Sequence, residues 1–125
     1  MKFEIGEGKH KIFCEIKEIG EDFLLIIYGG EKPHIGSICI AQPRTSLKEK
    51  SVISCTSSVF NFLGHKDEPI ARMFAEKICK KTERKVIGLA GIHIESATYE
   101  EINIILEHSK KLLKKVESLF DESLF

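Results

Sequence analysis

An unbroken apolar run, Phe23–Tyr28, constrains the fold of this chain more than any other segment. Successive side chains of a strand point to opposite faces, so a strand that is apolar at every position is expected to be covered on both faces. The cover is expected to come from helices or from a partner subunit. The run is far shorter than the roughly 18 residues that a membrane-spanning helix needs. It therefore predicts a central strand of a sheet.

The rest of the chain alternates between strand and helix patterns. Further strands are expected over residues 3–5, 11–19, 35–41 (closed by Pro43), 52–63 and 85–94, with a loop over 44–50. A helix is expected to start at Asp67 or Glu68, with Pro69 in its first turn, and a longer one at Thr98, where Thr98 and Glu101 have capping-box spacing. The strands come mostly in hairpin succession. The predicted fold is a single α+β domain over residues 1–125, a largely antiparallel sheet of about six strands with two helices.

Charge and cysteine content limit the possible functions. The 19 Lys and Arg residues balance 19 Asp and Glu residues, so electrostatic attraction to nucleic acid or to an acidic membrane is not expected. The four cysteines (Cys14, Cys39, Cys55 and Cys79) show no CxxC spacing and lie in apolar or small-residue runs, which favours core thiols in a reducing compartment. The N-terminal residues do not have a signal-peptide pattern. A cytoplasmic location is expected.

Three glycine- and histidine-containing segments, residues 29–36, 64–67 and 91–93, carry the candidate functional residues. Each follows a predicted strand, and loops at strand ends can converge on one site. The segment 64–67 also precedes a predicted helix, whose N-terminal amides favour an anion, and His65 and Lys66 would add positive charge. The alternative is that His65 and Lys66 are ordinary exposed loop residues beside a helix cap.

Enzymatic alternatives have weaker support. His34, His65 and His93 would form a three-histidine zinc site for hydrolysis if they met, but the sequence has no HxH or HExxH spacing. The sequence also lacks a GxSxG elbow and a complete phosphate-binding loop. The apolar pairs Leu119–Phe120 and Leu124–Phe125 are expected to pack on the sheet or in a partner subunit, which leaves an assembly scaffold as a further alternative. The residues alone predict an anion-binding pocket and no reaction.

The segments Gly30–Gly36, Gly64–Asp67 and Gly91–His93, with Pro-His-Ile-Gly, Gly-His-Lys-Asp and Gly-Ile-His as their central motifs, resemble the signature of the prenylated-flavin chaperone family. These are small accessory subunits of gallate-type UbiD decarboxylases. The order of elements is similar from about the second strand to the last helix. The resemblance implies a fold like that of the small proteasome-assembly chaperones, which are often dimers.

The resemblance also implies a function without catalysis: binding prenylated FMN and assisting its delivery to, or the maturation of, a UbiD-type decarboxylase. The chain is then expected to form a homo-oligomer, a dimer or larger. The residues that match the family motif are His34, Gly36, Gly64, His65, Lys66, Asp67 and His93. Gly64, His65 and Lys66 are suited to the flavin phosphate, and His34 and His93 to hydrogen bonds with the ring system. Arg44 is a further phosphate candidate.

Overall fold

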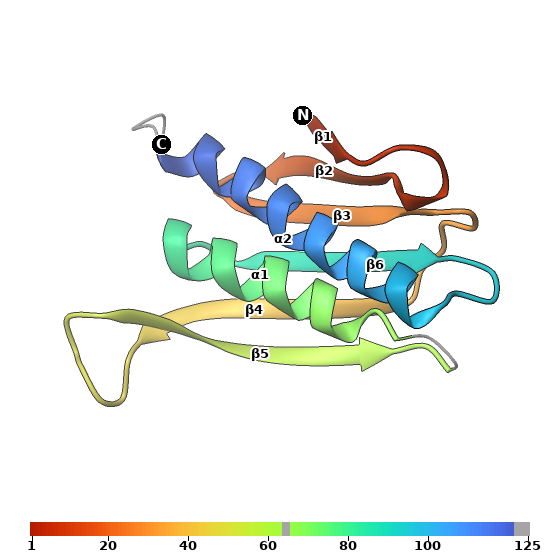
Figure 1. Ribbon diagram of the computed structural model, residues 1–125. Coiled ribbons are helices and arrows are strands. Elements are labelled where there is room, and N and C mark those ends of the chain that lie inside the picture. The colour runs from red at the N-terminus through yellow and green to blue at the C-terminus, as the bar shows by residue number, and fades with distance from the viewer. Residues whose placement is uncertain (64–65, 122–125) are drawn as a thin grey trace.

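The computed structural model, described here for residues 1–63 and 66–121, contains a six-stranded sheet of order β1-β2-β3-β6-β4-β5 and two α-helices (Figure 1). The elements are β1 (Lys2–Ile5), the short 3-10 turn η1 (Gly8–His10), β2 (Ile12–Ile19), β3 (Asp22–Gly30), β4 (Ser37–Thr45), β5 (Ile53–Asn61), α1 (Glu68–Thr82), β6 (Val86–His93) and α2 (Tyr99–Asp121). The predicted α+β fold, with a largely antiparallel sheet of six strands and two helices, is confirmed.

The position of β6 determines how the chain is threaded. All neighbouring strands are antiparallel except β3 and β6, which run parallel. Because β6 lies between β3 and β4, the connection from β3 to β4, residues 31–36, must cross the end of β6. Two of the three glycine- and histidine-containing segments, residues 29–36 and 91–93, therefore meet at one end of the strands.

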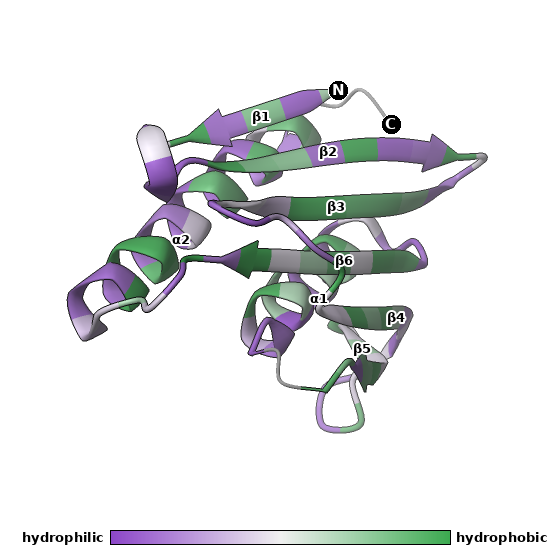
Figure 2. Ribbon diagram, turned by 90° about the vertical axis from the view of Figure 1, so that its right-hand side faces the viewer, coloured by the Kyte–Doolittle hydropathy of each residue, from purple (hydrophilic) through white to green (hydrophobic). Residues whose placement is uncertain are grey.

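Both helices cover the same face of the sheet, α1 over β4, β5 and β6, and α2 over β1 and β2 (Figure 1). The residues of β3 alternate along the strand between half-buried and buried: Phe23, Leu25 and Ile27 point into the core beneath the helices. Leu24 and Ile26 point to the opposite face, which no described segment covers. Figure 2 shows the apolar character of β3 along its length and the helices on one side of the sheet only. The expected cover on both faces of β3 is thus present on one face.

The boundaries of several elements differ from the predicted ones. Pro43 does not close β4 but lies within it, opposite Cys55 of β5. Strand β6 pairs with β4 only as far as Ala41. Beyond Ala41, β4 pairs with β5 alone, and its other side is a sheet edge, where a proline is tolerated. The predicted loop 44–50 accordingly begins later, after Thr45.

The two ends of α2 follow the predicted sequence signals. Glu101 N–H donates to Thr98 Oγ1 at 3.1 Å and Thr98 N–H to Glu101 Oε1 at 3.2 Å, which confirms the capping box. At the other end of α2, Phe120 packs edge-on against Phe23 with ring centroids 5.0 Å apart. The expected contact of Leu119–Phe120 with the core is present, and Leu124–Phe125 lies outside the described residues.

Candidate functional site

The linker 31–36 lies directly against the end of β6. The amides of Glu31 and Lys32 donate to the His93 carbonyl at 2.8 and 3.2 Å, and the Gly36 amide donates to the Ala90 carbonyl at 3.0 Å. This approach requires glycine at position 91, because a Cβ there would lie 1.5 Å from the His34 carbonyl oxygen. Gly91 therefore sets how closely the linker crosses the strand.

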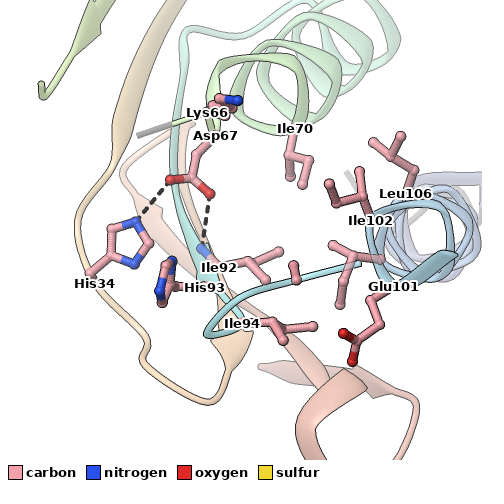
Figure 3. Close-up of a pocket in the computed structure, with 12 residues that line it drawn as sticks. His34, Lys66, Asp67, Ile70, Ile92, His93, Ile94, Glu101, Ile102 and Leu106 are labelled. Atoms are coloured by element: carbon pink, nitrogen blue, oxygen red, sulfur yellow. Dashed lines mark hydrogen bonds and ion pairs between the residues drawn. The ribbon is translucent and has the colours of Figure 1, made fainter. Parts of the chain in front are cut away.

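The Asp67 carboxylate joins all three segments. It lies 2.9 Å from His34 Nε2 through one oxygen and accepts a 2.9 Å hydrogen bond from the Ile92 amide through the other (Figure 3). Asp67 is also the N-cap residue of α1, but its side chain does not cap the helix; its carbonyl accepts from the amides of Ile70 and Ala71 instead. With only 4% of Asp67 exposed, a single buried carboxylate holds the linker, the helix start and the strand end together.

Two oxygen atoms hold the ring of His34 in place. Its Nδ1 lies 3.0 Å from the Lys32 carbonyl oxygen, and its Nε2 faces Asp67. Both ring nitrogens thus face oxygen atoms, which fixes the orientation of the ring. The His93 ring lies beside His34, with centroids 6.1 Å apart and the planes nearly perpendicular.

A pocket of about 320 Å³ opens beside this junction, between the start of α1, the end of β6 and the first turns of α2. Its polar end carries His34, Lys66, Asp67 and His93 (Figure 3). Its other walls are mostly aliphatic, formed by Ile70, Ile92, Ile94, Ala97, Ile102, Ile105 and Leu106, with Glu101 at the rim. One end of the pocket can therefore hydrogen-bond a ligand while the other can only make apolar contacts.

Two of the aliphatic wall residues lie on the outer side of the pocket, on α2. Ile102 is 48% exposed and Leu106 is 37% exposed, whereas Ile105, one turn away, is 8% exposed and packs in the core. Full burial of an isoleucine or leucine side chain stabilises by about 1.5–3 kcal/mol. A ligand that covered Ile102 and Leu106 would gain part of that free energy.

Glu101 at the rim is held in its charged form. Lys9 Nζ lies 2.7 Å and His10 Nε2 3.1 Å from its Oε2, and Thr98 donates to its Oε1. These contacts, the Lys9 hydrogen bond above all, lower the pKa of Glu101 to about 2. Glu101 thereby fixes η1 to the start of α2 and defines the outer edge of the pocket.

A second set of charged contacts at the rim of the pocket involves His93. Its Nε2 lies 3.3 Å from a Glu95 oxygen that is also 2.9 Å from Lys32 Nζ. Hydrogen bonds from Lys32 and His93 lower the pKa of Glu95. The His93 side chain is still 43% exposed, so it remains accessible from the pocket mouth.

The structure brings four of the predicted site residues together in one pocket: His34, Lys66, Asp67 and His93. Gly36 does not line the pocket. A Cβ on Gly36 would lie 1.9 Å from Asp67 Oδ2, so the glycine makes room for the His34–Asp67 contact. Gly64 and His65 lie outside the described residues. Arg44 lies at the far end of β4, where its Nε donates to Thr56 Oγ1 at 2.9 Å, and it is not a neighbour of this pocket.

The aliphatic walls were not among the residues predicted for the site. The apolar positions of α2 are typical of an amphipathic helix, but only some of them are buried in the core: Ile105, Leu112, Leu113 and Val116. The sequence did contain one signal for this wall: the first two turns of α2 have more apolar residues than the core buries. Ile92 and Ile94 carried a weaker signal, since they flank His93 in the sequence.

The described residues offer neither a metal-ion site nor a membrane-spanning helix. No group of three His, Cys, Asp or Glu side chains in the described part has the geometry to hold a metal ion, and His65 lies outside that part. Neither described helix is long and apolar enough to cross a membrane.

Comparison with known proteins first defines the fold class. A subunit from the solved structure described as a novel chaperone complex for yeast 20S proteasome assembly matches with a TM-score of 0.61, at 16% sequence identity, over 100% of this chain and 96% of that chain. At this identity the match shows a shared fold only. No match was found among curated proteins.

The family model of the prenylated flavin chaperone LpdD-like domain matches residues 6–121, nearly the whole chain. The chain belongs to this family. The resemblance that the three segments indicated is thereby confirmed.

Proposed function

We propose that the chain binds prenylated FMN in the pocket between α1, β6 and α2, and delivers it to a UbiD-type decarboxylase. The observation that carries the proposal is the position of the three family motifs, which meet at the Asp67 carboxylate beside a pocket with one polar and one aliphatic end. Membership of the prenylated flavin chaperone family supports the identity of the ligand.

The chemistry of the pocket fits such a ligand. Prenylated FMN combines a flat, hydrogen-bonding ring system with an added hydrocarbon ring and an anionic phosphate. A volume of about 320 Å³ is at the lower end of small-molecule sites, so it suits a ring system better than a whole nucleotide. We place the hydrocarbon part against Ile102, Ile105 and Leu106, and the polar edge of the ring at His34 and His93.

The phosphate then extends outward past Lys66. Lys66 is exposed and comes directly before the start of α1, where helix amides and a lysine both favour an anion. His65 and Gly64 complete this proposal from the sequence. Asp67 and Gly36 act indirectly, since Asp67 orients His34 and Gly36 makes room for Asp67.

The proposed role involves no catalysis by this chain, because the residues hold a cofactor whose chemistry takes place in the decarboxylase. We further propose that it acts as a homo-oligomer in the cytoplasm. The cysteines are all unpaired thiols, which supports a reducing compartment.

Anaerobic titration with prenylated FMN, with FMN as a comparison, tests the proposal. The wild-type chain is expected to bind one molecule per pocket. Lys66→Ala and His93→Ala are each expected to weaken binding about 5- to 30-fold, the loss of one polar contact worth about 1–2 kcal/mol. Lys48→Ala, an exposed lysine in the loop after β4, is the matched control and should change nothing.

A second pair of variants tests the pocket itself. Ala97 is exposed and lines the pocket, so Ala97→Trp should fill it without disturbing the core, while Ala97→Ser should bind as the wild type does. Absence of prenylated FMN binding at 100-fold the concentration of protein would rule the proposal out. Stoichiometric zinc or iron in protein purified without a histidine tag would favour the metal-dependent hydrolase instead.

A further inference from the structure

A second cavity, of about 410 Å³, lies between the two helices and shares no residue with the pocket described above. The residues that line it have the same spacing, i, i+3, i+4 and i+7, on both helices, so each set forms one face of its helix. On α1 they are Met73, Glu76, Lys77 and Lys80, and on α2 they are Lys110, Leu113, Lys114 and Glu117. We call this cavity the lysine groove.

The lysine groove is positively charged, although the formal net charge of the chain is zero. The two glutamates of its lining do little to neutralise it, because each already faces a cation that is not part of the lining. Glu76 Oε2 lies 3.3 Å from Arg72 Nη1 and accepts a hydrogen bond from the Ser57 hydroxyl. Glu117 Oε2 lies 3.9 Å from Lys81 Nζ, near the C-terminal ends of the two helices. The four lysines therefore dominate the charge of the groove.

Three of these lysines have no carboxylate partner in the described part of the chain: no carboxylate oxygen there lies within 4 Å of the Nζ atom of Lys77, Lys80 or Lys114. Lys110 Nζ lies 3.6 Å from Glu107, but both side chains are 63% exposed, and water weakens such a pair. Lysines one helical turn apart repel one another. An anionic group held between the helices would relieve this repulsion, so the groove favours an anionic occupant.

The floor of the lysine groove is apolar. Met73 is half-buried and Leu113 is 6% exposed, and a methionine side chain adapts to apolar groups of irregular shape. From Met73 to Lys80 the groove follows two turns of α1, a length of about 10 Å. A helix laid between two others meets such a surface with an apolar stripe that has charged residues on both sides.

We propose that the lysine groove binds an acidic amphipathic helix of a partner protein. The apolar stripe of that helix rests on Met73 and Leu113, and its aspartate and glutamate side chains face the lysines of α1 on one side and of α2 on the other. A nucleic acid fits these features less well, because its phosphates make no use of an apolar floor and the chain has no overall positive charge.

The lysine groove and the cofactor pocket follow one another along the same two helices, which lie side by side and run in the same direction (Figure 1). Ile70 of the pocket comes one turn before Met73 of the groove, and Leu106 comes one turn before Lys110. A bound helix would therefore lie next to the pocket and leave its lining residues free. The proposal does not depend on which ligand the pocket binds.

Fluorescence anisotropy tests the proposal with a labelled helical peptide of about 20 residues that carries leucines on one face and glutamates on the other. The wild-type chain should bind it with a micromolar dissociation constant that rises with salt. Lys77→Glu and Lys114→Glu should each raise that constant at least about tenfold, and Lys77→Arg should leave it unchanged. The matched control is Lys111→Glu, which makes the same charge change at an exposed position of α2 outside the groove and should have an effect of about threefold or less.

The two methionines of the chain show where the peptide binds. In protein with labelled methionine methyl groups, the NMR signal of Met73 should shift on addition of the peptide, and that of Met1, which is 70% exposed and does not line the groove, should stay in place. Circular dichroism shows that each variant is folded. The groove variants should also bind prenylated FMN as the wild type does, so this proposal and the proposed function can fail separately.

Three results would overturn the proposal. The first is the absence of saturable binding at about 1 mM peptide, or a Met73 signal that does not move. The second is an equal loss of affinity in Lys77→Glu and Lys111→Glu, which would show that only net charge matters. The third is tighter binding of a DNA duplex that carries the same charge as the peptide and loses affinity in the same variants, which would make the groove a nucleic-acid surface.

Discussion

Removal of the Asp67 side chain is the sharpest test of how the three segments are held together. Asp67→Ala leaves His34 Nε2 and the Ile92 amide without their 2.9 Å acceptor in a buried position. A hydrogen bond to a charged group contributes about 1.5–3 kcal/mol, so the loss of two predicts a decrease of roughly 3–5 kcal/mol in the free energy of unfolding. That is a large share of the about 5–15 kcal/mol typical of a domain.

Asp67→Asn separates charge from hydrogen bonding. Its amide oxygen can still accept from Ile92, and its NH₂ group can donate to His34 Nε2 while the other ring nitrogen donates to the Lys32 carbonyl. This variant should lose only about 1–2 kcal/mol, because both contacts persist as neutral hydrogen bonds.

Urea denaturation followed by circular dichroism measures both losses. The control is Glu107→Ala, which removes an exposed carboxylate with a 3.6 Å contact to Lys110 and should change stability by less than about 0.5 kcal/mol. A loss below about 1 kcal/mol for Asp67→Ala, or equal losses for the alanine and asparagine variants, would refute the reasoning.

Three further predictions concern the linker, the rim and the thiols. Gly91→Ala should lower the melting temperature by about 5 °C or more and weaken the His34–Asp67 contact, because the new Cβ would lie 1.5 Å from the His34 carbonyl; a melting curve equal to that of the wild type would contradict this. The pKa of Glu101 is lowered from 4.5 to about 2, so its contribution to stability is complete above about pH 5 and is lost as the pH falls from about 4.5 to about 2. Urea denaturation between pH 2 and 6 should therefore show a flatter profile for Glu101→Gln, and parallel profiles would count against the Lys9–Glu101 contact. Burial raises the pKa of Cys14 and Cys79 to about 12, so in the native protein at pH 8 the half-buried Cys55 should react first with a thiol reagent; labelling of Cys79 as fast as Cys55 would disprove it.

Much of the fold could be predicted from the sequence because its signals are local. The apolar run of β3, the Thr98–Glu101 capping box and the proline in the first turn of α1 each act within a few residues. The role of Pro43 was predicted wrongly because a proline is tolerated there only where β4 extends past the first residue of β6, and β6 is more than 40 residues away in the sequence. The sequence pattern of β3 could not show that one of its faces is uncovered, because this depends on where the two helices pack.

The site was predictable in part for a similar reason. Motif residues flank strand ends, so the meeting of His34, Asp67 and His93 follows from topology once β6 lies between β3 and β4. The roles of the glycines do not follow from sequence, since Gly36 and Gly91 each make room for an atom of a distant segment. The aliphatic wall was hidden because Ile102 and Leu106 look like ordinary members of a helix stripe.

Amide chemical-shift mapping with prenylated FMN tests the central proposal most directly, because it reports where the ligand binds as well as whether it binds. We predict the largest shifts at Lys66, around Ile92–Ile94 and in the first two turns of α2, with little change at Ile26 and Ile40, which lie on the sheet face opposite the helices. Shifts concentrated on the sheet face opposite the helices, or no shifts at saturating ligand, would contradict the proposed binding site.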